Sequence, residues 1–399
     1  MKKLMILGGS RYVIPVIKKA HELGLFVITC DYLPDNIAHS YSDDYVNISI
    51  VEKEKVLEVA RKINIDGIIS FACDPGVVTA AYVAEKLNLP SAGSYNSICI
   101  LQNKRRFREF LAENGFNVPV AKGYHSVDDA LLDAQLFNWP VIVKPVDSAG
   151  SKGVTKVDSV SSLKTAIIKA LKISKSGEFI IEDYLEQVGY SSDTDCFSVD
   201  GKLEFVSFNA QLFDKNAENP YTPAAYFWPS LISDEKQNEL TSEINRLISL
   251  LDLKTSIYNI ETRVCRDGKA YIMELSPRGG GNRLAECLDY VTGSNLIENV
   301  IRSAVGFPLV KFENLHYNYY LAEIILHAHN DGVFKELYIS DDLKKNVFEL
   351  DLWVDMNDDV NSFSAANNSL GTMILKFNDK DEMLSIMSNI DSHIKVIVE

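Results

Sequence analysis

Several kinds of segment are missing from this sequence, and each absence narrows what the protein can be. No apolar stretch is long enough to span a lipid bilayer, so a membrane protein is not expected. Basic tails, low-complexity tracts and internal repeats are also absent. The net charge of −15 argues against binding to nucleic acid, which needs a basic face. It does not exclude an anionic small molecule, because a local cluster of basic residues can oppose the overall sign.

Cysteine is scarce and dispersed. The 399 residues contain six cysteines, with no C-x-x-C pair among them. We therefore expect free thiols in a reducing compartment, and neither a zinc site nor a disulfide framework. The apolar run near Met1 breaks at Gly8, which is too early for the apolar core of a secretory signal. These features together predict a cytoplasmic protein.

A complete dinucleotide-binding fingerprint is missing as well. Residues 4–8 read as a buried strand, followed by Gly9-Ser10-Arg11, a helix, and a second strand at 26–30 that ends in Asp31. This pattern resembles half of a Rossmann fold. However, the full G-x-G-x-x-G is absent, and the glycine turn fits equally well a loop that holds another anion at a helix N-terminus. Both interpretations stay open, and residues 1–95 are expected to form a small parallel α/β domain.

The most informative segment that is present runs from Ile260 to Asn282. Asp267-Gly268 lies between alternating apolar runs, which is the strongest short-range signal for a β-hairpin. Equal spacing on the two sides of this turn places Glu261 opposite Glu274. Two such carboxylates repel each other unless a cation lies between them, and oxygen ligands that leave room for phosphate suit Mg²⁺. The alternative, an exposed acidic pair on a sheet edge, fits less well because the neighbouring residues are apolar.

Hydrophobic periodicity and turn residues predict the remaining elements. The expected helices lie at 74–87, 104–114, 234–251, 296–305 and 379–390, and the expected strands at 67–71, 141–145, 179–182, 319–327, 347–354, 371–377 and 393–398. A loop of small residues is expected at 147–153, and an irregular, aromatic-rich stretch at 216–229. The length of the chain predicts two or three domains.

Five motifs follow one another along the first three quarters of the chain. They are K-x-x-x-R-x-x-L-x-x-x-G from Lys104 to Gly115, P-V-I-V-K-P from Pro140 to Pro145, S-A-G-S-K-G from Ser148 to Gly153, E-D-Y-L from Glu182 to Leu185, and the paired glutamates followed by R-G-G-G. In this order they resemble the ATP-grasp superfamily, and within it the carboxylate–amine ligases. The resemblance covers most of residues 1–305, and more loosely the rest.

The resemblance implies a fold of the α/β and α+β classes in three parts. A Rossmann-like N-terminal (pre-ATP-grasp) domain would occupy residues 1–95. A two-lobed ATP-grasp domain would follow at 96–306, with its small lobe at about 115–185. A small C-terminal α+β subdomain would occupy 307–399.

The resemblance also implies an ATP site. Lys104 and Lys144 would reach the phosphates as point charges, and backbone N–H groups of the small-residue loop would cradle them. The E-D-Y-L strand would meet the adenine, with Glu182 at its amine. The acidic residue that usually holds the ribose is not at its usual place, so Asp193 is the expected substitute and Asp195 the second choice. The candidate nucleotide-binding residues are Lys104, Lys144, Ser148, Ala149, Gly150, Ser151, Gly153, Glu182, Asp183, Tyr184, Leu185 and Asp193.

Metal ligands are implied in the same way. Glu261 and Glu274 match the family's ligands for the Mg²⁺ that bridges the β- and γ-phosphates, with one ion or two, and Mn²⁺ could replace it. The family often has Asn two residues after the second glutamate. Ser276 stands there instead, and we expect this weaker donor to be the third ligand.

The substrate-binding residues come from two segments. Arg278 matches the arginine that clamps the transferred phosphate and the tetrahedral intermediate, and we count it with Lys144 as catalytic. Gly279, Gly280 and Gly281 lead into a helix whose first N–H groups could hold the substrate carboxylate or acyl phosphate. Tyr226 and Trp228 fit an acceptor pocket and the hydrophobic core equally well.

Three other residues carry weaker expectations. Asp74 follows a strand of the first domain, where a cap on the next helix is favoured over a contact with substrate. His327 and His329 alternate on a strand and could suggest a metal pair. With no third ligand evident in the neighbouring sequence, a structural role is favoured.

The resemblance implies an ATP-dependent ligase that acts on a small-molecule carboxylate and an amine. L-amino acid ligases and carbamoyl-phosphate-synthase-like ligases are the nearest in pattern, so the carboxylate is expected to belong to an amino acid or peptide. Alternatives are a purine-pathway carboxylase or transferase of the same fold, and a nucleotide-binding protein that does not turn over. A dehydrogenase would require dinucleotide binding by the first domain. No nucleic acid or membrane partner is expected, and a homodimer is common among such ligases.

Overall fold

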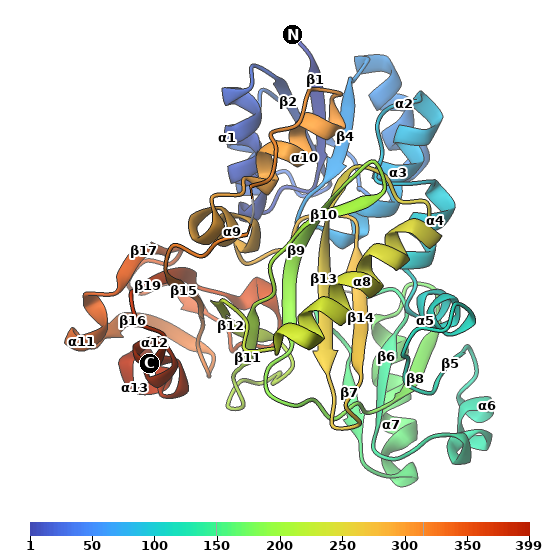
Figure 1. Cartoon of the computed structure of the whole chain (residues 1–399), viewed down its shortest axis with the longest axis vertical. Coiled ribbons are helices and arrows are strands. Elements are labelled where there is room, and N and C mark those ends of the chain that lie inside the picture. The colour runs from blue at the N-terminus through green and yellow to red at the C-terminus, as the bar shows by residue number, and fades with distance from the viewer. Residues whose placement is uncertain (149, 314) are drawn as a thin grey trace.

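The computed structural model describes residues 1–148, 150–313 and 315–399. Its N-terminal part, at the top of Figure 1, is a parallel sheet of four strands in the order β3-β2-β1-β4. The strands are β1 (Lys3–Leu7), β2 (Phe26–Asp31), β3 (Asp44–Asn47) and β4 (Gly67–Ser70), and the helices are α1 (Ile14–Glu22), α2 (Lys53–Ile63) and α3 (Asp74–Leu87).

Both faces of this sheet are covered, which explains why β1 is a continuous apolar run. Leu4 and Ile6 belong to the same hydrophobic cluster as residues of α1 and α10 (Leu296–Ala304). Met5 and Leu7 point to the other face and pack with α2 and α3. The helix α10 comes from much later in the chain, so the first domain is closed by a segment that returns to it.

The small lobe, at the lower right of Figure 1, is a sheet in the order β5-β8-β6-β7. Two helices before it, α4 (Tyr95–Leu101) and α5 (Lys104–Glu113), link it to the first domain. Its elements are β5 (Ala121–Tyr124), α6 (Val127–Leu132), β6 (Val141–Pro145), β7 (Thr155–Val157), α7 (Val160–Ile173) and β8 (Phe179–Asp183). Apolar residues of α7 and of β6 and β8 form its core.

The central sheet has the order β10-β9-β13-β14 and runs down the middle of Figure 1. Its elements are β9 (Ser192–Val199), β10 (Lys202–Val206), α8 (Asp234–Leu250), β13 (Ser256–Val264) and β14 (Ala270–Ser276). The hydrophobic side of α8 packs on one face. The hairpin predicted at Asp267-Gly268 is confirmed, because β13 and β14 pair antiparallel and Glu261 lies directly opposite Glu274.

The C-terminal part, at the lower left of Figure 1, centres on an antiparallel sheet in the order β11-β12-β15-β19-β17. A smaller sheet has the order β18-β16-β20. The strands are β11 (Ala210–Phe213), β12 (Pro223–Trp228), β15 (Tyr320–Leu326), β16 (Gly332–Ile339), β17 (Val347–Leu352), β18 (Asp359–Val360), β19 (Gly371–Phe377) and β20 (Ile394–Val398). The helices are α9 (Leu284–Thr292), which leads to this part, and α11 (Asp341–Lys344), α12 (Lys380–Ser388) and α13 (Ile390–His393) within it.

Two strands of the C-terminal sheet come from the middle of the chain. The prediction that residues 216–229 are irregular is wrong for 223–228, because these residues form β12 between β11 and β15. Apolar side chains alternate poorly here because both faces of β12 are covered, which hides the strand signal. The C-terminal sheet therefore contains strands from both sides of residue 306, the expected boundary between the last two domains.

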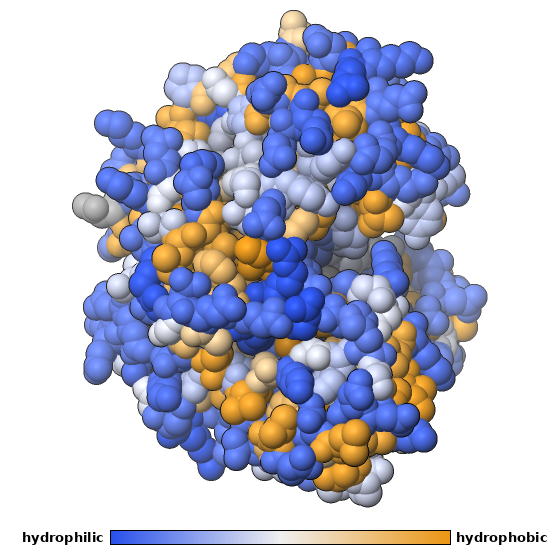
Figure 2. Space-filling view, turned by 90° about the vertical axis from the view of Figure 1, so that its right-hand side faces the viewer, coloured by the Kyte–Doolittle hydropathy of each residue, from blue (hydrophilic) through white to orange (hydrophobic). Residues whose placement is uncertain are grey.

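One face of the molecule is hollowed. Figure 2 shows a hollow across the middle of one face, lined largely by hydrophilic residues. Among the described residues, no helix combines the length and apolar character that crossing a bilayer would require. The six cysteines are free thiols, as predicted.

Candidate active site

Three carboxylates lie side by side on the central sheet. Glu261 of β13 is opposite Glu274 of β14 on one side and Asp193 of β9 on the other. Directly opposed residues of an antiparallel pair project from the same face, so the three acids form a row across the strands. Like charges at this spacing destabilise the sheet unless cations lie close to them.

Basic side chains compensate this row. A guanidinium nitrogen of Arg263 lies 2.7 Å from an oxygen of Glu261, and Lys104 Nζ lies 3.5 Å from Glu274 Oε2. Burial raises the pKa of Glu261, but Arg263 and the charge of Lys144 more than offset this, so its pKa lies below the ordinary value. Burial and the charge of Glu261 raise the pKa of Asp193 to about 7.

A second row of polar side chains lies two residues further along the strands. It consists of Ser276, Asn259 and Asp195, in matching register. The amide nitrogen of Asn259 donates to Asp193 at 2.9 Å and to Asp195 at 3.2 Å. Its amide oxygen accepts no hydrogen bond from any residue that the structure describes. Asn259 therefore presents a hard oxygen beside the carboxylate row.

The buried ion pairs of Glu182 connect the small-lobe sheet to α5. Lys144 Nζ lies 2.7 Å from Glu182 Oε2, and Arg108 Nε lies 2.9 Å from Glu182 Oε1. Burial raises the pKa of Glu182, but the two cations outweigh it and bring the pKa to about 2. Burial lowers the pKa of Lys144, Glu182 opposes this, and the nearby charges of Arg108 and Lys104 lower it further. The carboxylate of Glu182, expected at the adenine amine, is thus engaged with Lys144 and Arg108.

Lys104 joins the two lobes at the first turn of α5. Its backbone N–H donates to the carbonyl of Val146, which fixes the start of the helix beside the end of β6. Its ammonium group donates to the carbonyl of Ser148 at 2.9 Å and lies near Glu274. Lys104, Lys144, Glu261 and Glu274 are therefore gathered in one region between the lobes, although they come from four separate segments.

The loop of small residues adjoins this region. Ser148 Oγ donates to the carbonyl of Lys152, and Ser151 Oγ donates to the carbonyl of Tyr221, both at 2.9 Å. Gly150, Ser151 and Gly153 have φ between 57° and 77°, which glycine adopts without strain and Ser151 does not. Ala149 lies outside the described residues.

The segment expected to meet adenine is held mainly through Asp183. Its carboxylate accepts from the backbone N–H and the amide nitrogen of Asn138, at 2.9 and 2.7 Å. The N–H of Tyr184 donates to the carbonyl of Pro140, while Leu185 is half-buried just after the strand. The backbone at Asp183 and Tyr184 is thus held by Asn138 and Pro140, which lie just before β6.

Arg278 is locked by an acid from the first domain. Its Nε and a terminal nitrogen each donate at 2.8 Å to the two oxygens of Asp74, and its other terminal nitrogen donates to the carbonyl of Gly279. Burial lowers the pKa of Arg278, but Asp74 outweighs it and the pKa rises. The prediction that Asp74 caps α3 is wrong, because the cap position is Cys73 and the Asp74 side chain turns to Arg278.

Ser276 belongs to the same network. Its hydroxyl accepts from Gln102 and donates to Asp74, both at 2.8 Å. This leaves one lone pair on a buried hydroxyl, so Ser276 is poorly placed to act as a full third metal ligand.

The first two glycines after Arg278 are tightly packed. A Cβ on Gly279 would lie 2.2 Å from the ring of Phe71. The N–H of Gly280, expected to hold substrate, donates instead to both oxygens of Asp195 at 2.8 and 3.0 Å. Burial is the main cause that raises the pKa of Asp195 to about 7. Gly281 has open space where its Cβ would be, and α9 begins three residues later.

The two aromatic candidates differ. Tyr226 is buried, but its hydroxyl donates to Asp193 at 3.0 Å and accepts from Asn282, so it borders the carboxylate row. Trp228 is fully buried in the main hydrophobic core. The structure therefore favours the core alternative for Trp228 and leaves Tyr226 beside the site.

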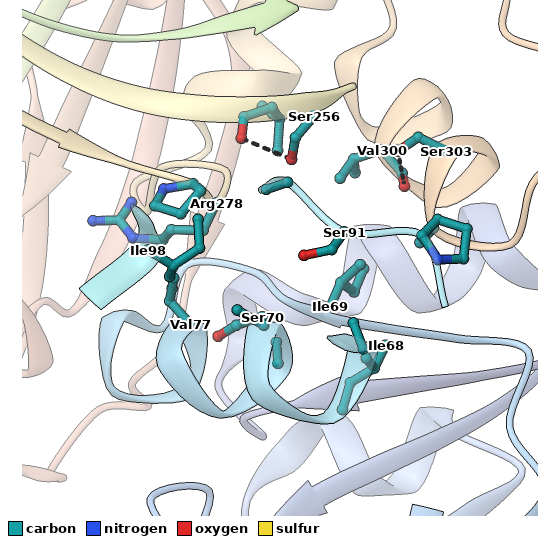
Figure 3. A pocket seen from close by; sticks show the side chains of 18 of the residues that line it. Ile68, Ile69, Ser70, Val77, Ser91, Ile98, Ser256, Arg278, Val300 and Ser303 are labelled. Atoms are coloured by element: carbon teal, nitrogen blue, oxygen red, sulfur yellow. Dashed lines mark hydrogen bonds between the residues drawn. The ribbon is translucent and has the colours of Figure 1, made fainter. Parts of the chain in front are cut away.

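Figure 3 shows a small cavity at the back of this region, between β4, α3 and the central sheet. It has a volume of about 50 Å³ and is lined mainly by apolar side chains and a few serines. Arg278 lies at one end, with its guanidinium directed away from Ser91 and Ser256. This cavity has room for a few water molecules, which is far less than a nucleotide needs.

Sequence reasoning missed several residues of the site. Asn259 and Arg263 lie two residues on either side of Glu261, so strand periodicity could have placed them on its face. Arg108 stands in the motif that begins at Lys104, and Asp74 is expected from the sequence to cap a helix, but their partners Glu182 and Arg278 lie far along the chain and no local pattern marks these contacts.

Comparison with known proteins agrees with this architecture. The profile of the ATP-grasp domain matches residues 137–286. The carbamoyl phosphate synthase large chain of Pseudothermotoga lettingae is 28% identical over 259 residues, which is 64% of this chain and 23% of that protein. The chain thus aligns with about a quarter of the length of this curated relative.

Solved structures share the whole fold. The L-amino acid ligase from Bacillus licheniformis is 21% identical and superposes with a TM-score of 0.83, covering 100% of this chain and 99% of that one. N5-carboxyaminoimidazole synthetase from Staphylococcus aureus, solved with ADP, is 16% identical with a TM-score of 0.75, covering 97% and 96%.

These similarities confirm the predicted fold class, which combines α/β and α+β parts, and the predicted family. Residues 137–286 match the ATP-grasp domain, so this part of the chain is an ATP-grasp domain.

Proposed function

We propose that this protein is an ATP-dependent ligase that converts a substrate carboxylate to an acyl phosphate and joins it to an amine, releasing ADP and phosphate. The observation that supports this most directly is the gathering of Lys104, Lys144, Glu261 and Glu274 between the lobes. Phosphoryl transfer depends on positioning and on charge neutralisation, so cations for the phosphates and acids for a metal are needed within one site.

The donor set of the carboxylate row fits Mg²⁺. It offers oxygen atoms from Glu261 and Glu274, with Asp193 beside them, and no nitrogen or sulfur ligand. We infer that the amide oxygen of Asn259 takes the place of the family's usual asparagine, with Ser276 as a weaker addition. Bound there, one or two Mg²⁺ ions, or Mn²⁺, would neutralise charge on the β- and γ-phosphates during transfer.

The lysines act on the nucleotide phosphates. In this proposal, Glu182 and Arg108 hold Lys144 in place, and Lys104 approaches from α5 on the opposite side. The loop around Gly150 supplies backbone N–H groups to the phosphates. Since the Glu182 carboxylate is engaged, adenine recognition falls mainly to backbone groups of residues 182–185. The ribose contact of Asp193 is the less favoured part, because Asp193 faces Glu261 and Tyr226.

Arg278 is the proposed clamp on the reacting groups. Asp74 and the carbonyl of Gly279 use three of its five N–H groups, which leaves one on each terminal nitrogen. Two parallel N–H groups suit two oxygens of a transferred phosphoryl group or a tetrahedral intermediate. The paired contact with Asp74 fixes the plane of the guanidinium.

Two observations support a substrate class: the fold similarity to an L-amino acid ligase and the polar groups that lie beside Asp193. The fold similarity to an L-amino acid ligase extends over the whole chain, including the C-terminal sheet. Hydroxyl and amide groups of Tyr226, Tyr12 and Asn282 meet beside Asp193, where they could recognise a substrate that carries both amino and carboxyl groups. We propose an amino acid or peptide carboxylate and a small amine as substrates, in a cytoplasmic enzyme that could form a homodimer.

The test is release of ADP by the purified chain with ATP, Mg²⁺ and mixtures of amino acids. The proposal predicts release that requires one carboxylate and one amine, with a ligated product detectable by mass spectrometry. Mixtures are then split until the active pair is found.

A matched variant separates this result from contaminating ATPase. Arg266 forms an exposed ion pair with Glu186, away from the carboxylate row, so Arg266→Ala should behave like wild type while Arg278→Ala should not. Tight ATP binding without ADP release in any mixture would contradict the ligase and support a nucleotide-binding regulator. Release that requires bicarbonate in place of an amino acid would indicate the purine-pathway alternative.

A further inference from the structure

A cluster of two histidines and an aspartate lies in the C-terminal sheet. Asp214 follows β11, His327 follows β15, and His329 comes two residues later. Asp214 Oδ2 lies 3.0 Å from His327 Nε2 and 2.6 Å from His329 Nε2. The sequence around His327 offers no third group of this kind, but the fold brings Asp214 to both histidines. Asp214 comes from a segment more than one hundred residues earlier in the chain.

The hydrogen bonds of His327 favour a cation at this place. Its Nδ1 lies 2.6 Å from the carbonyl oxygen of Ile325, and its Nε2 faces Asp214. Both neighbours are acceptors, whereas a neutral imidazole has only one N–H. The carbonyl keeps the proton on Nδ1, which is the arrangement that orients a metal-binding histidine and leaves the Nε2 lone pair for the ion.

The geometry is close to that of a metal site. All three ligand atoms lie within 4.8 Å of one another. Ligands about 2.0–2.2 Å from a tetrahedral zinc ion stand about 3.3 Å apart, so small side-chain movements would admit one. Asp214 Oδ1 accepts from the N–H of Asn216, which leaves Oδ2 as the ligand atom. His327 stacks on Phe363 at 4.1 Å, so its ring is already fixed.

The cluster is open on one side. The side chain of His329 is 47% exposed, whereas those of His327 and Asp214 are 12% and 8% exposed. An ion can therefore enter from solvent, and a water molecule or another small ligand can complete its coordination. Imidazole nitrogens favour Zn²⁺ or a similar transition metal over the Mg²⁺ expected at the carboxylate row.

We propose that Asp214, His327 and His329 bind a single transition-metal ion of the Zn²⁺ class, at a site separate from the nucleotide site. The ion would fix the segment between β11 and β12, which begins at Asp214. That segment contacts the small-residue loop, because Ser151 donates to the carbonyl of Tyr221. A bound ion would thus stabilise the segment that supports the small-residue loop, and this loop is expected at the nucleotide phosphates. The ion itself would not contact substrate.

Binding of Zn²⁺ to the full-length chain tests this directly. Chelator-treated protein is titrated with Zn²⁺ by calorimetry in excess Mg²⁺, and with Co²⁺, whose absorption spectrum reports tetrahedral coordination with nitrogen ligands. We expect one ion per chain, and binding about 100-fold weaker in His327→Ala and His329→Ala. His329→Ala alters a half-exposed side chain, so it keeps the test valid if His327→Ala fails to fold.

The control is His21→Ala. His21 also contacts an aspartate, Asp43, at 2.9 Å, but has no second histidine. It should leave Zn²⁺ affinity unchanged. Equal binding in wild type, His329→Ala and His21→Ala, or no binding in wild type, would overturn the proposal and leave a hydrogen-bonded pair of histidines. The measurement uses neither ATP nor substrate, so its failure would not bear on the ligase.

Discussion

The carboxylate row of the central sheet and the histidine cluster of the C-terminal sheet are assembled in different ways. Glu261 and Glu274 meet through a hairpin of adjacent strands. Asp214 and His327 follow β11 and β15, which belong to one sheet because both pair with β12. The first has oxygen donors and basic neighbours, and the second has imidazole nitrogens and one acid. The carboxylate pair can be predicted from the sequence because its strands are adjacent along the chain. The histidine cluster cannot, because its residues come from segments that are far apart in the sequence.

The largest expected effect separates the two centres. Replacing Arg278 with alanine removes a fixed donor for the reacting groups, so turnover should fall by about 10²–10³ while ATP binding persists. His329→Ala should lower Zn²⁺ affinity and change turnover far less. Steady-state ADP release and ATP titration calorimetry measure both. Near-normal turnover in Arg278→Ala would remove the proposed role of this arginine.

A smaller effect is expected for Asp74→Asn. The amide keeps one acceptor for Arg278 but loses the charge and the second oxygen, so the guanidinium is held less firmly. We expect kcat to fall about tenfold, with KM for ATP unchanged, because Asp74 acts by positioning. Initial rates over a range of ATP concentrations would show this. An increase in KM with constant kcat would indicate instead that Asp74 supports nucleotide binding.

Stability should depend on pH through Asp195. Its pKa is about 7 in the folded protein and about 3.9 when unfolded, so the folded state holds the proton more tightly between these values. Stability should therefore fall as pH rises from about 4 to 7 and then level off, by up to about 4 kcal/mol from this group.

Urea unfolding at pH 5 and pH 8 tests this effect. Asp195→Asn keeps an acceptor for the N–H of Gly280 but cannot titrate, so the difference between the two pH values should shrink. An unchanged difference would mean that other groups cause it. Measurements are made without Mg²⁺, which would alter the neighbouring acids.

The smallest effect is expected at Tyr226. Tyr226→Phe removes a hydroxyl that donates to Asp193, with little change in packing, and should lower stability by about 1 kcal/mol.

Trp228→Phe leaves a gap in the core and should destabilise the fold without changing substrate preference. A change of preferred amino acid in Trp228→Phe would return this residue to the substrate pocket.

Much of the fold could be predicted from the sequence because the signals are local. Helices at Asp74 and Asp234 begin where the sequence predicts, and the strand at 141–145 matches. The strand at 223–228 could not be found in this way, because its residues are buried on both faces and its partners lie far along the chain.

The candidate site divides in the same manner. The lysines and glutamates stand in motifs with fixed spacing, so resemblance places them together. Asp74, Arg108 and Asn259 come from the packing of domains or from cross-strand neighbours. Their roles become visible only when hydrogen bonds and ion pairs are known.

A crystal structure of the protein with ADP and Mg²⁺ would test whether the two lysines and two glutamates form one nucleotide site. We expect the phosphates to lie between the ammonium groups of Lys104 and Lys144, with Mg²⁺ held by Glu261 and Glu274. A nucleotide bound elsewhere, for example at the glycine turn of residues 8–11, with the four side chains left empty, would contradict it.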